Sequence, residues 1–236
     1  MIDPSAAAFS QLAAFLRGGR LTAVVAGLEA ELSSADAAGA ASAGAEAGIA
    51  PELLAAAMLV RRDVGRLNDL IHAAAITLAL PHILEPDERL VKRPSLAAGN
   101  SPAQSYDIET DRRIAEFKLA TWAGTDAMRK RGVFHDLVHL AADTSDRRPE
   151  LYVVGQLPIR FLTQSRSTAR WALNRGADST RELYVSRFDD LDLPVRDFTR
   201  GPAVRVRLID LAGVLPAVAE AQSPDLDAPP QGTGLS

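Results

Sequence analysis

The chain has 236 residues, of which 47% are hydrophobic, and a formal net charge of -4 at pH 7. This length allows one domain with a proper core, or one domain with an appendage. The absence of cysteine excludes a disulfide framework, a thiolate zinc site and a cysteine nucleophile. The acidic balance argues against indiscriminate nucleic-acid binding, but it leaves room for local basic patches.

The sequence predicts a cytoplasmic protein that does not associate with a membrane. The first residues, Met1 to Pro4, lack the basic and apolar regions of a signal peptide. The longest apolar run, residues 73–81, is too short to cross a bilayer.

Two helices are expected within residues 4–33, where apolar residues recur at helical spacing on both sides of a Gly-Gly break. Residues 34–49 are mostly alanine, glycine and serine, and they predict a flexible linker. A short helix is expected after Pro51, because proline suits the first turn. Residues 1–49 are therefore interpreted as a helical segment with a flexible Ala/Gly linker.

A long helix over about residues 63–84 is the best-marked element. Asp63 is a candidate N-cap, and an apolar face follows it at helical spacing. Asn68 and His72 lie within or beside this face, and they are interpreted as an inner polar pair or as part of a site. The apolar face consists of Val64, Leu67, Ile71, Ala74, Ala75 and Leu78.

Three strands, a helix and a fourth strand are expected next. Residues 89–96 predict an edge or bent strand, because a proline interrupts them. Residues 105–119 predict two short strands joined by a polar turn. A helix capped near Asp126 runs to about residue 142, and residues 151–155 predict a buried strand.

The C-terminal third is less regular. Residues 158–174 predict a helix, residues 181–188 a strand or a helix, and residues 203–211 an alternating strand. Residues 223–236 are rich in proline, aspartate and glycine, and they predict a disordered tail.

The most informative residues lie in the predicted hairpin. If its strands pair, Asp107 faces Glu116 across the ladder, and Lys118 points from the same face as Glu116. Two acids and a lysine on one patch can hold a divalent metal ion beside a phosphodiester bond. A surface hairpin with a cross-strand ion pair is the alternative.

The element order and this motif together resemble the PD-(D/E)xK phosphodiesterase superfamily, the restriction-endonuclease-like fold. Asp107 matches the first acid of its signature, Glu116 the second acid and Lys118 the lysine. The resemblance covers about residues 63–155. It implies an α/β fold with a restriction-endonuclease-like core (αβββαβ, a mixed sheet flanked by helices), placed in a domain over residues 50–222.

The resemblance also implies a cofactor and a set of roles. Mg²⁺, or Mn²⁺, would be held by Asp107, Glu116 and the backbone carbonyl of Phe117. Lys118 would orient or deprotonate the attacking water, or stabilise the transition state. Glu109, one pleat from Asp107, is a further candidate ligand.

The chain departs from the superfamily pattern at two positions. Tyr106 stands where the signature has proline. Many members carry a glutamate on the first core helix as an extra metal ligand, and this helix offers Asn68 and Asp69 instead. These two residues are therefore additional candidate ligands.

Several basic residues are candidates for contacts with substrate. Lys130 is the nearest match to a basic residue that superfamily members place on the second helix, and it is a candidate catalytic residue. Four arginines are candidates for nucleic-acid binding, with a solvated helix face or turn as the alternative. They are Arg112, Arg113, Arg129 and Arg131.

His135 and His139 are spaced four residues apart on one helix, as in some zinc sites. No glutamate occupies the metalloprotease position between them, and the flanking residues are apolar. Ordinary helix packing is therefore the favoured interpretation. His135 with Asp136 also resembles the dyad of metal phosphohydrolases, but supporting ligands are not evident.

The expected function is metal-dependent hydrolysis of nucleic-acid phosphodiesters, of DNA rather than RNA, in DNA processing or defence. One alternative is a catalytically inactive nuclease-fold protein that binds nucleic acid or a protein partner. Another is a helical interaction module in which residues 4–33 mediate oligomerisation, for example as a homodimer.

Overall fold

The computed structural model divides the chain into two compact units, residues 1–68 and residues 69–236. The boundary follows residue 68, whereas the sequence placed it near residue 49. The structure describes residues 3–19, 21–33, 35–96, 105–122, 126–174 and 178–221.

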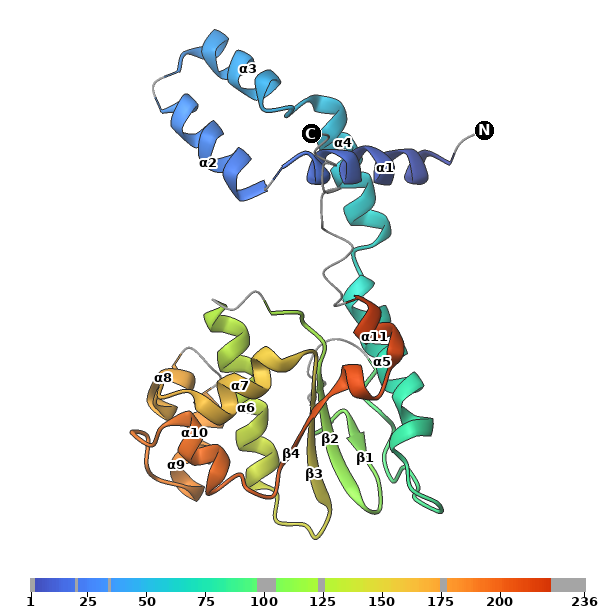
Figure 1. Cartoon of the computed structure of the whole chain (residues 1–236), viewed down its shortest axis with the longest axis vertical. Coiled ribbons are helices and arrows are strands. Elements are labelled where there is room, and N and C mark those ends of the chain that lie inside the picture. The colour runs from blue at the N-terminus through green and yellow to red at the C-terminus, as the bar shows by residue number, and fades with distance from the viewer. Residues whose placement is uncertain are drawn as a thin grey trace, which may run out of the picture. The chain divides into compact units, whose positions relative to one another are not determined.

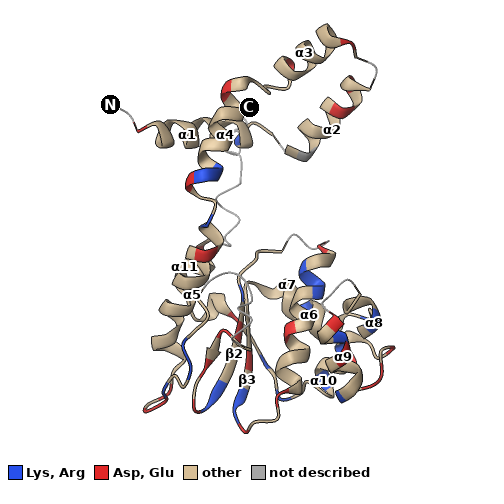
Figure 2. Cartoon of the chain, turned by 180° about the vertical axis from the view of Figure 1, so that it is seen from behind, with Lys and Arg blue, Asp and Glu red and all other residues tan. Residues whose placement is uncertain are grey.

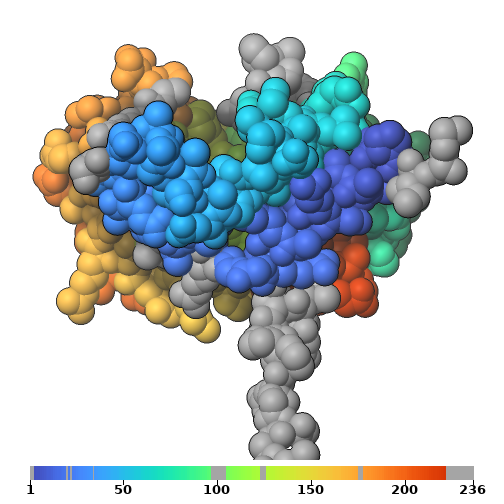
Figure 3. All heavy atoms as spheres, turned by 90° about the horizontal axis from the view of Figure 1, so that it is seen from above, coloured from blue at the N-terminus to red at the C-terminus, as the bar shows by residue number. Residues whose placement is uncertain are grey.

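The first unit is helical. Its helices are α1 (Pro4–Arg17), α2 (Leu21–Leu32), α3 (Ala37–Glu46) and α4 (Pro51–Asp63). The first helix packs against the fourth, and the second lies beside the third (Figures 1 and 3). The buried core of this unit is small and consists of Ala8, Ala56 and Val60, with Leu12 and Leu59 packed against it.

Two features of this unit differ from the sequence prediction. Residues 37–46 form a helix rather than a linker, because Asp36 caps it by accepting a hydrogen bond from the Gly39 N–H at 2.8 Å and alanine favours helix. Asp63 ends α4 instead of capping the long helix, and its carboxylate accepts a hydrogen bond from the Ser5 hydroxyl at 2.6 Å.

The second unit is an α/β domain built on a mixed four-stranded sheet, which confirms the predicted class. The strands are β1 (Ile108–Glu109), β2 (Arg113–Lys118), β3 (Arg148–Val153) and β4 (Arg207–Asp210), in the order β1-β2-β3-β4. The first pair is antiparallel, and the other two pairs are parallel. The predicted hairpin is therefore present.

Helices cover both faces of this sheet (Figure 1). Helix α5 (Leu67–Ile83) packs on one face together with the 3-10 turn η1 (Leu211–Gly213), from which the short helix α11 (Pro216–Ala221) continues. On the other face, the sheet packs against helix α6 (Ala127–Ala142). That layer also contains α7 (Gln156–Gln164), α8 (Ala169–Ala172), α9 (Asp178–Arg187) and α10 (Val195–Arg200).

Residues 89–95 do not form a regular strand, although they run beside β1. Leu90 makes an isolated antiparallel bridge with Thr110. The N–H of Val91 donates to the Glu109 carbonyl at 3.0 Å, and that of Ser95 donates to the Asp107 carbonyl at 2.9 Å. The segment thus takes the place of the predicted first strand, and Pro94, which has no N–H to donate, limits the ladder.

The C-terminal predictions are partly correct. The single helix expected over residues 158–174 is interrupted and forms two helices, α7 and α8. Between them, Thr168 makes an isolated antiparallel β-bridge with Pro194. Residues 178–187 are helical, and only residues 207–210 form the last strand. The predicted tail, residues 223–236, lies outside the described residues.

A buried ion network fixes the hairpin to the rest of the sheet. The Arg113 guanidinium contacts the Glu88 carboxylate at 2.5 Å and the Glu150 carboxylate at 2.9 Å. The Thr110 hydroxyl donates to Glu88 at 2.6 Å, and the Tyr152 hydroxyl donates to Glu150 at 2.8 Å. This network lies at the start of β2 and β3, so it sets the register that carries the candidate site.

Within the part of the chain that the structure describes, no single helix is both long and apolar enough to cross a membrane. A segment that meets these criteria arises only when α3 is taken together with α4 and α5.

Candidate functional site

The hairpin brings Asp107 and Glu116 together, as the sequence predicts. Ile108 pairs with Ala115 and Glu109 with Ile114, so the next position opposes Asp107 to Glu116. Both side chains are nearly buried, with 12% and 13% of their surface exposed. Glu116 lies on the α6 face of the sheet, because Ile114 on the same face packs against α6 while Phe117 packs against α5. Asp107 precedes β1 and opposes Glu116 at the end of the hairpin.

Asp107 is held by two further groups. Its Oδ2 atom accepts a hydrogen bond from the Phe117 N–H at 2.9 Å. The same oxygen lies 3.3 Å from Nε2 of His72, which comes from α5. The carboxylate is therefore fixed by the neighbouring strand and by the first helix of the domain.

Lys118, the last residue of β2, reaches over the same face. Its Nζ atom lies 3.1 Å from the Asp136 carboxylate of α6 and 3.9 Å from the Glu116 carboxylate. About a third of the Lys118 side chain is exposed, so it forms the accessible edge of the cluster. We name Asp107, Glu116, Lys118 and Asp136 the carboxylate–lysine cluster.

The buried carboxylates of this cluster repel one another, and Lys118 offsets only part of that repulsion. Burial raises the pKa of Glu116 to about 9, and the charges of Asp136 and Asp107 add to the effect, while Lys118 opposes it. Burial likewise raises the pKa of Asp136. The Glu116 carboxyl therefore holds a proton at neutral pH, and added positive charge would release it.

Lys118 itself remains charged. Burial alone would lower the pKa of its ammonium group, but the charge of Asp136, with that of Glu116 when it is ionised, outweighs burial and raises that pKa. A protonated ammonium can stabilise negative charge but cannot accept a proton. Among the roles open at the sequence level, electrostatic stabilisation therefore fits Lys118 better than general-base catalysis.

The sequence leaves two interpretations of His72 open, an inner polar pair with Asn68 or part of a site. Burial alone would lower its pKa, but the hydrogen bond and charge of Asp107 raise it. In its protonated form, His72 neutralises part of the negative charge of Asp107.

The donor set of the cluster suits a hard divalent cation. Two carboxylates, with the backbone carbonyl of Phe117 between Glu116 and Lys118, supply only oxygen. Mg²⁺ is commonly held by one or two carboxylates together with waters and substrate phosphates. Among the described residues, no group of three or more His, Asp or Glu side chains is placed to hold a metal ion. Donor sets made of oxygen alone suit Mg²⁺ or Mn²⁺ better than zinc.

One additional candidate ligand, Glu109, is committed to basic partners. Glu109 is buried and paired with Lys92 at 2.7 Å and with Arg147 at 2.9 Å, and these hydrogen bonds outweigh burial and lower its pKa. Its carboxylate is thus already neutralised by protein. Asn68 and Asp69 lie at the start of α5, in its first turn, where Asn68 is exposed and Asp69 is half-buried.

The predicted nucleic-acid contacts divide into buried and accessible residues. The predicted nucleic-acid contact of Arg113 is wrong, because its side chain is buried in the network with Glu88 and Glu150. Arg131 stacks over the Trp171 ring at 4.9 Å and is committed to packing. Arg112 pairs with Glu85 at 3.2 Å, and Arg129 pairs with Asp126 at 3.0 Å, in exposed positions.

The two histidines of α6 are packing residues in the described structure. Burial lowers the pKa of His135 and of His139, so both are neutral at pH 7. His139 Nε2 lies 2.9 Å from the Thr180 hydroxyl. With no third ligand among the described side chains, the zinc interpretation gains no support.

At the level of the sequence, Asp136 is considered only in a dyad with His135 and is not placed beside Lys118. A signal was present: Val133, Asp136, Leu137 and Leu140 follow the i, i+3, i+4, i+7 spacing of a buried helix face. An acid at an apolar position of that face indicates a buried partner, and Lys118 is that partner.

Comparisons with known proteins give no indication of function. No protein-family model, no curated protein and no solved structure matches the chain.

Proposed function

We propose that the chain is a metal-dependent nuclease with a restriction-endonuclease-like core, and that it hydrolyses phosphodiester bonds of DNA rather than RNA. The observation that carries the proposal is the carboxylate–lysine cluster. Two facing acids, with a lysine two residues further along the strand, are the side chains that the PD-(D/E)xK signature requires.

The order of elements around the cluster supports the same proposal. Helix α5 precedes the irregular edge segment at residues 89–95, which is followed by β1, β2, α6 and β3. The edge segment and β1 are antiparallel, as are β1 and β2, whereas β2 and β3 are parallel. With residues 89–95 in the place of the first strand, this order is compatible with the αβββαβ order that the resemblance implies.

The charge balance of the cluster favours a divalent cation. Glu116 holds its proton because Asp107 and Asp136 lie nearby in a buried setting. A cation near Asp107 and Glu116 would replace that proton and relieve the repulsion. When bound, Mg²⁺ would supply Lewis acidity toward a phosphate oxygen and toward a nucleophilic water.

The protein side chains then have separate tasks. Asp107 and Glu116 would hold the cation, and the Phe117 N–H and His72 keep Asp107 oriented. Lys118 would place its positive charge against the phosphate oxygens as negative charge builds up during the displacement. Asp136 would act as a positioning residue that fixes the Lys118 ammonium group.

A cleavage assay tests the proposal. Plasmid, linear duplex and single-stranded DNA, with RNA for comparison, are incubated with Mg²⁺ or Mn²⁺. We expect the wild type to cut DNA, and Asp107→Asn or Lys118→Met to lower the rate by about a hundredfold or more, as removal of one transition-state contact does. Asp146→Asn, which removes an exposed acid beyond α6, serves as the control and is expected to leave the rate unchanged.

A nuclease-fold protein that binds without cutting is the second candidate. It is favoured because, among the described residues, no group of three or more His, Asp or Glu side chains is placed to hold a metal ion. Binding of DNA by the wild type, with no cleavage under any metal condition, would establish this candidate and reject the first. Equal cleavage by the wild type and Asp107→Asn would reject the cluster as the active site.

A further inference from the structure

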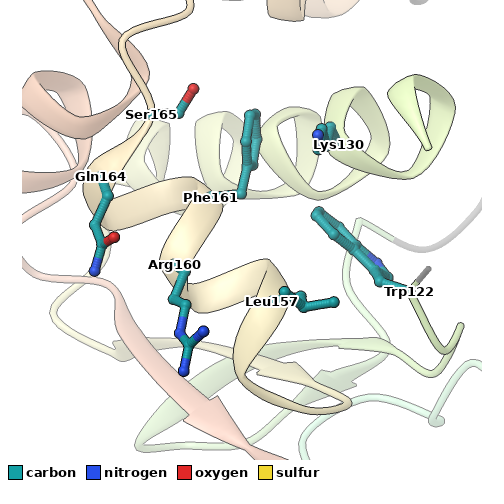
Figure 4. Close-up of a pocket in the computed structure, with 7 residues that line it drawn as sticks. All are labelled: Trp122, Lys130, Leu157, Arg160, Phe161, Gln164 and Ser165. Atoms are coloured by element: carbon teal, nitrogen blue, oxygen red, sulfur yellow. The ribbon is translucent and has the colours of Figure 1, made fainter. Parts of the chain in front are cut away.

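A pocket of about 280 Å³ lies between the start of α6 and helix α7 (Figure 4). Such a volume is near the lower end of the range for ligand pockets, so it suits one base-sized group. The lining residues come from the segment after β2, from α6 and from α7. They are Trp122, Lys130, Leu157, Arg160, Phe161 and Gln164, with Ser165 at the end of α7.

The lining combines flat apolar surface with positive charge. The Trp122 and Phe161 rings lie 6.0 Å apart, and the Leu157 side chain is 42% exposed beside them. Lys130 and Arg160 supply two cations, and no acid lines the pocket. Within the described residues, neither cation has an ion pair or a ring contact, whereas Arg129 and Arg131 next to Lys130 are engaged.

The pocket and the carboxylate–lysine cluster lie toward the same edge of the sheet. Lys118 and Val153 pair at the ends of the parallel strands β2 and β3, and ligands of α/β sheets bind outside such carboxyl ends. Trp122 follows Lys118 by four residues, so their Cα atoms are at most about 14 Å apart. Lys130 precedes Asp136 by six residues, about 9 Å along α6. Figure 2 shows basic residues gathered at this start of α6.

We propose that this pocket binds one unstacked nucleotide of a single-stranded segment that leads into the active site. Its base would lie against Trp122, Leu157 and Phe161, and its flanking phosphates against Lys130 and Arg160. Aromatic side chains beside cations accept a base of any sequence, since every base has a π-face. The inference rests on the proposed nuclease function and specifies its substrate as DNA with a single-stranded end, flap or loop.

Binding can be measured without any cleavage. A labelled single-stranded oligonucleotide and its duplex are titrated in EDTA, which removes divalent cations. We expect the single strand to bind more tightly. Trp122→Leu should weaken its binding by about fivefold or more, the lower end of a stacking contribution. The variant Lys130→Gln/Arg160→Gln should also weaken it, and should reduce the slope of log K against log salt by about 1.4, or about 0.7 per lost phosphate contact.

A charge-matched variant provides the control. Arg166→Gln/Arg181→Gln removes two exposed arginines that do not line the pocket. If this control weakens binding as much as Lys130→Gln/Arg160→Gln, attraction is diffuse and the pocket proposal fails. It also fails if the wild type binds no single strand, or if Trp122→Leu binds like the wild type. Circular dichroism identifies any misfolded Trp122→Leu protein, and the Lys130/Arg160 pair then decides alone.

Fluorescence separates a strand from a free nucleotide. In a Trp171→Phe protein, Trp122 is the remaining tryptophan of the chain, and its emission reports on the pocket. Quenching by the oligonucleotide supports the proposal, and quenching by a deoxynucleoside monophosphate alone overturns it in favour of a free-nucleotide site. Because these titrations need no metal, they can succeed when the cleavage assay fails, and the two proposals remain separable.

Discussion

At the residue scale, Glu116 links stability to pH. Its folded pKa of about 9 lies above the ordinary value of 4.5, so the folded protein binds a proton that the unfolded chain releases between these values. The stability associated with this proton is fully present below about pH 4.5, and it is lost as pH rises toward 9. A divalent cation at the same place would reverse this loss.

We therefore expect Glu116→Gln to stabilise the metal-free protein at alkaline pH. The amide has no proton to lose, so the melting temperature of the variant should exceed that of the wild type by about 2–8 °C near pH 9, as for a gain of about 1–2 kcal/mol. The difference should shrink toward pH 5. Thermal melts in EDTA across this range provide the measurement, and a constant difference at all pH values would contradict a raised Glu116 pKa.

Asp136 has a role that pH can also reveal. Because its carboxylate raises the pKa of Lys118, Asp136→Asn should lower that pKa. The pH at which the cleavage rate falls on the alkaline side should therefore decrease. Asp136→Glu should return this pH part of the way to the wild-type value. A variant that loses rate equally at every pH would assign Asp136 a purely structural role.

At the element scale, the hairpin depends on the Arg113 network. Burial alone would raise the pKa of Glu88, but its hydrogen bonds from Arg113 and Thr110 outweigh burial and lower that pKa to about 2. Removing the guanidinium would leave two buried carboxylates, Glu88 and Glu150, without their main partner. Such a loss costs about 3–5 kcal/mol.

We expect Arg113→Met to lower the melting temperature by about 6–20 °C, at 2–4 °C per kcal/mol for a chain of this size. The matched control is Arg170→Met, which breaks the exposed pair with Asp192 and should change little. Differential scanning calorimetry at pH 7 compares the two. Equal effects of both variants would show that the network does not hold the hairpin.

The sequence predicts those features that depend on neighbouring residues in the chain. It does not predict features that depend on contacts with residues far away in the sequence. The facing pair Asp107 and Glu116 follows from the two-residue period of strands, and the start of α6 follows from its Asp126 cap. The burial of Arg113 does not follow, because Glu88 and Glu150 that compensate its charge lie 25 and 37 residues away. The segment at residues 89–95 fails as a strand for a local reason, its proline.

At the scale of the whole molecule, the two units have unequal cores. The carboxylate–lysine cluster, the pocket and both large hydrophobic clusters lie in residues 69–236. Among its described residues, the helical unit buries Ala8, Ala43, Leu53, Ala56 and Val60, and it exposes large apolar side chains such as Phe9, Leu54 and Met58. A segment of this size with so small a core is marginally stable by itself.

We therefore expect residues 66–236 to fold alone and residues 1–66 not to. The larger fragment should melt in one cooperative transition, bind the single-stranded oligonucleotide as the full chain does, and retain cleavage. The smaller fragment should show helical circular dichroism without a cooperative melt, because its helices lack a shared core. Sedimentation of the full chain and of the larger fragment would show whether the exposed apolar residues of the first unit join two copies. A larger fragment that aggregates would show that the helical unit is required for the α/β domain to fold.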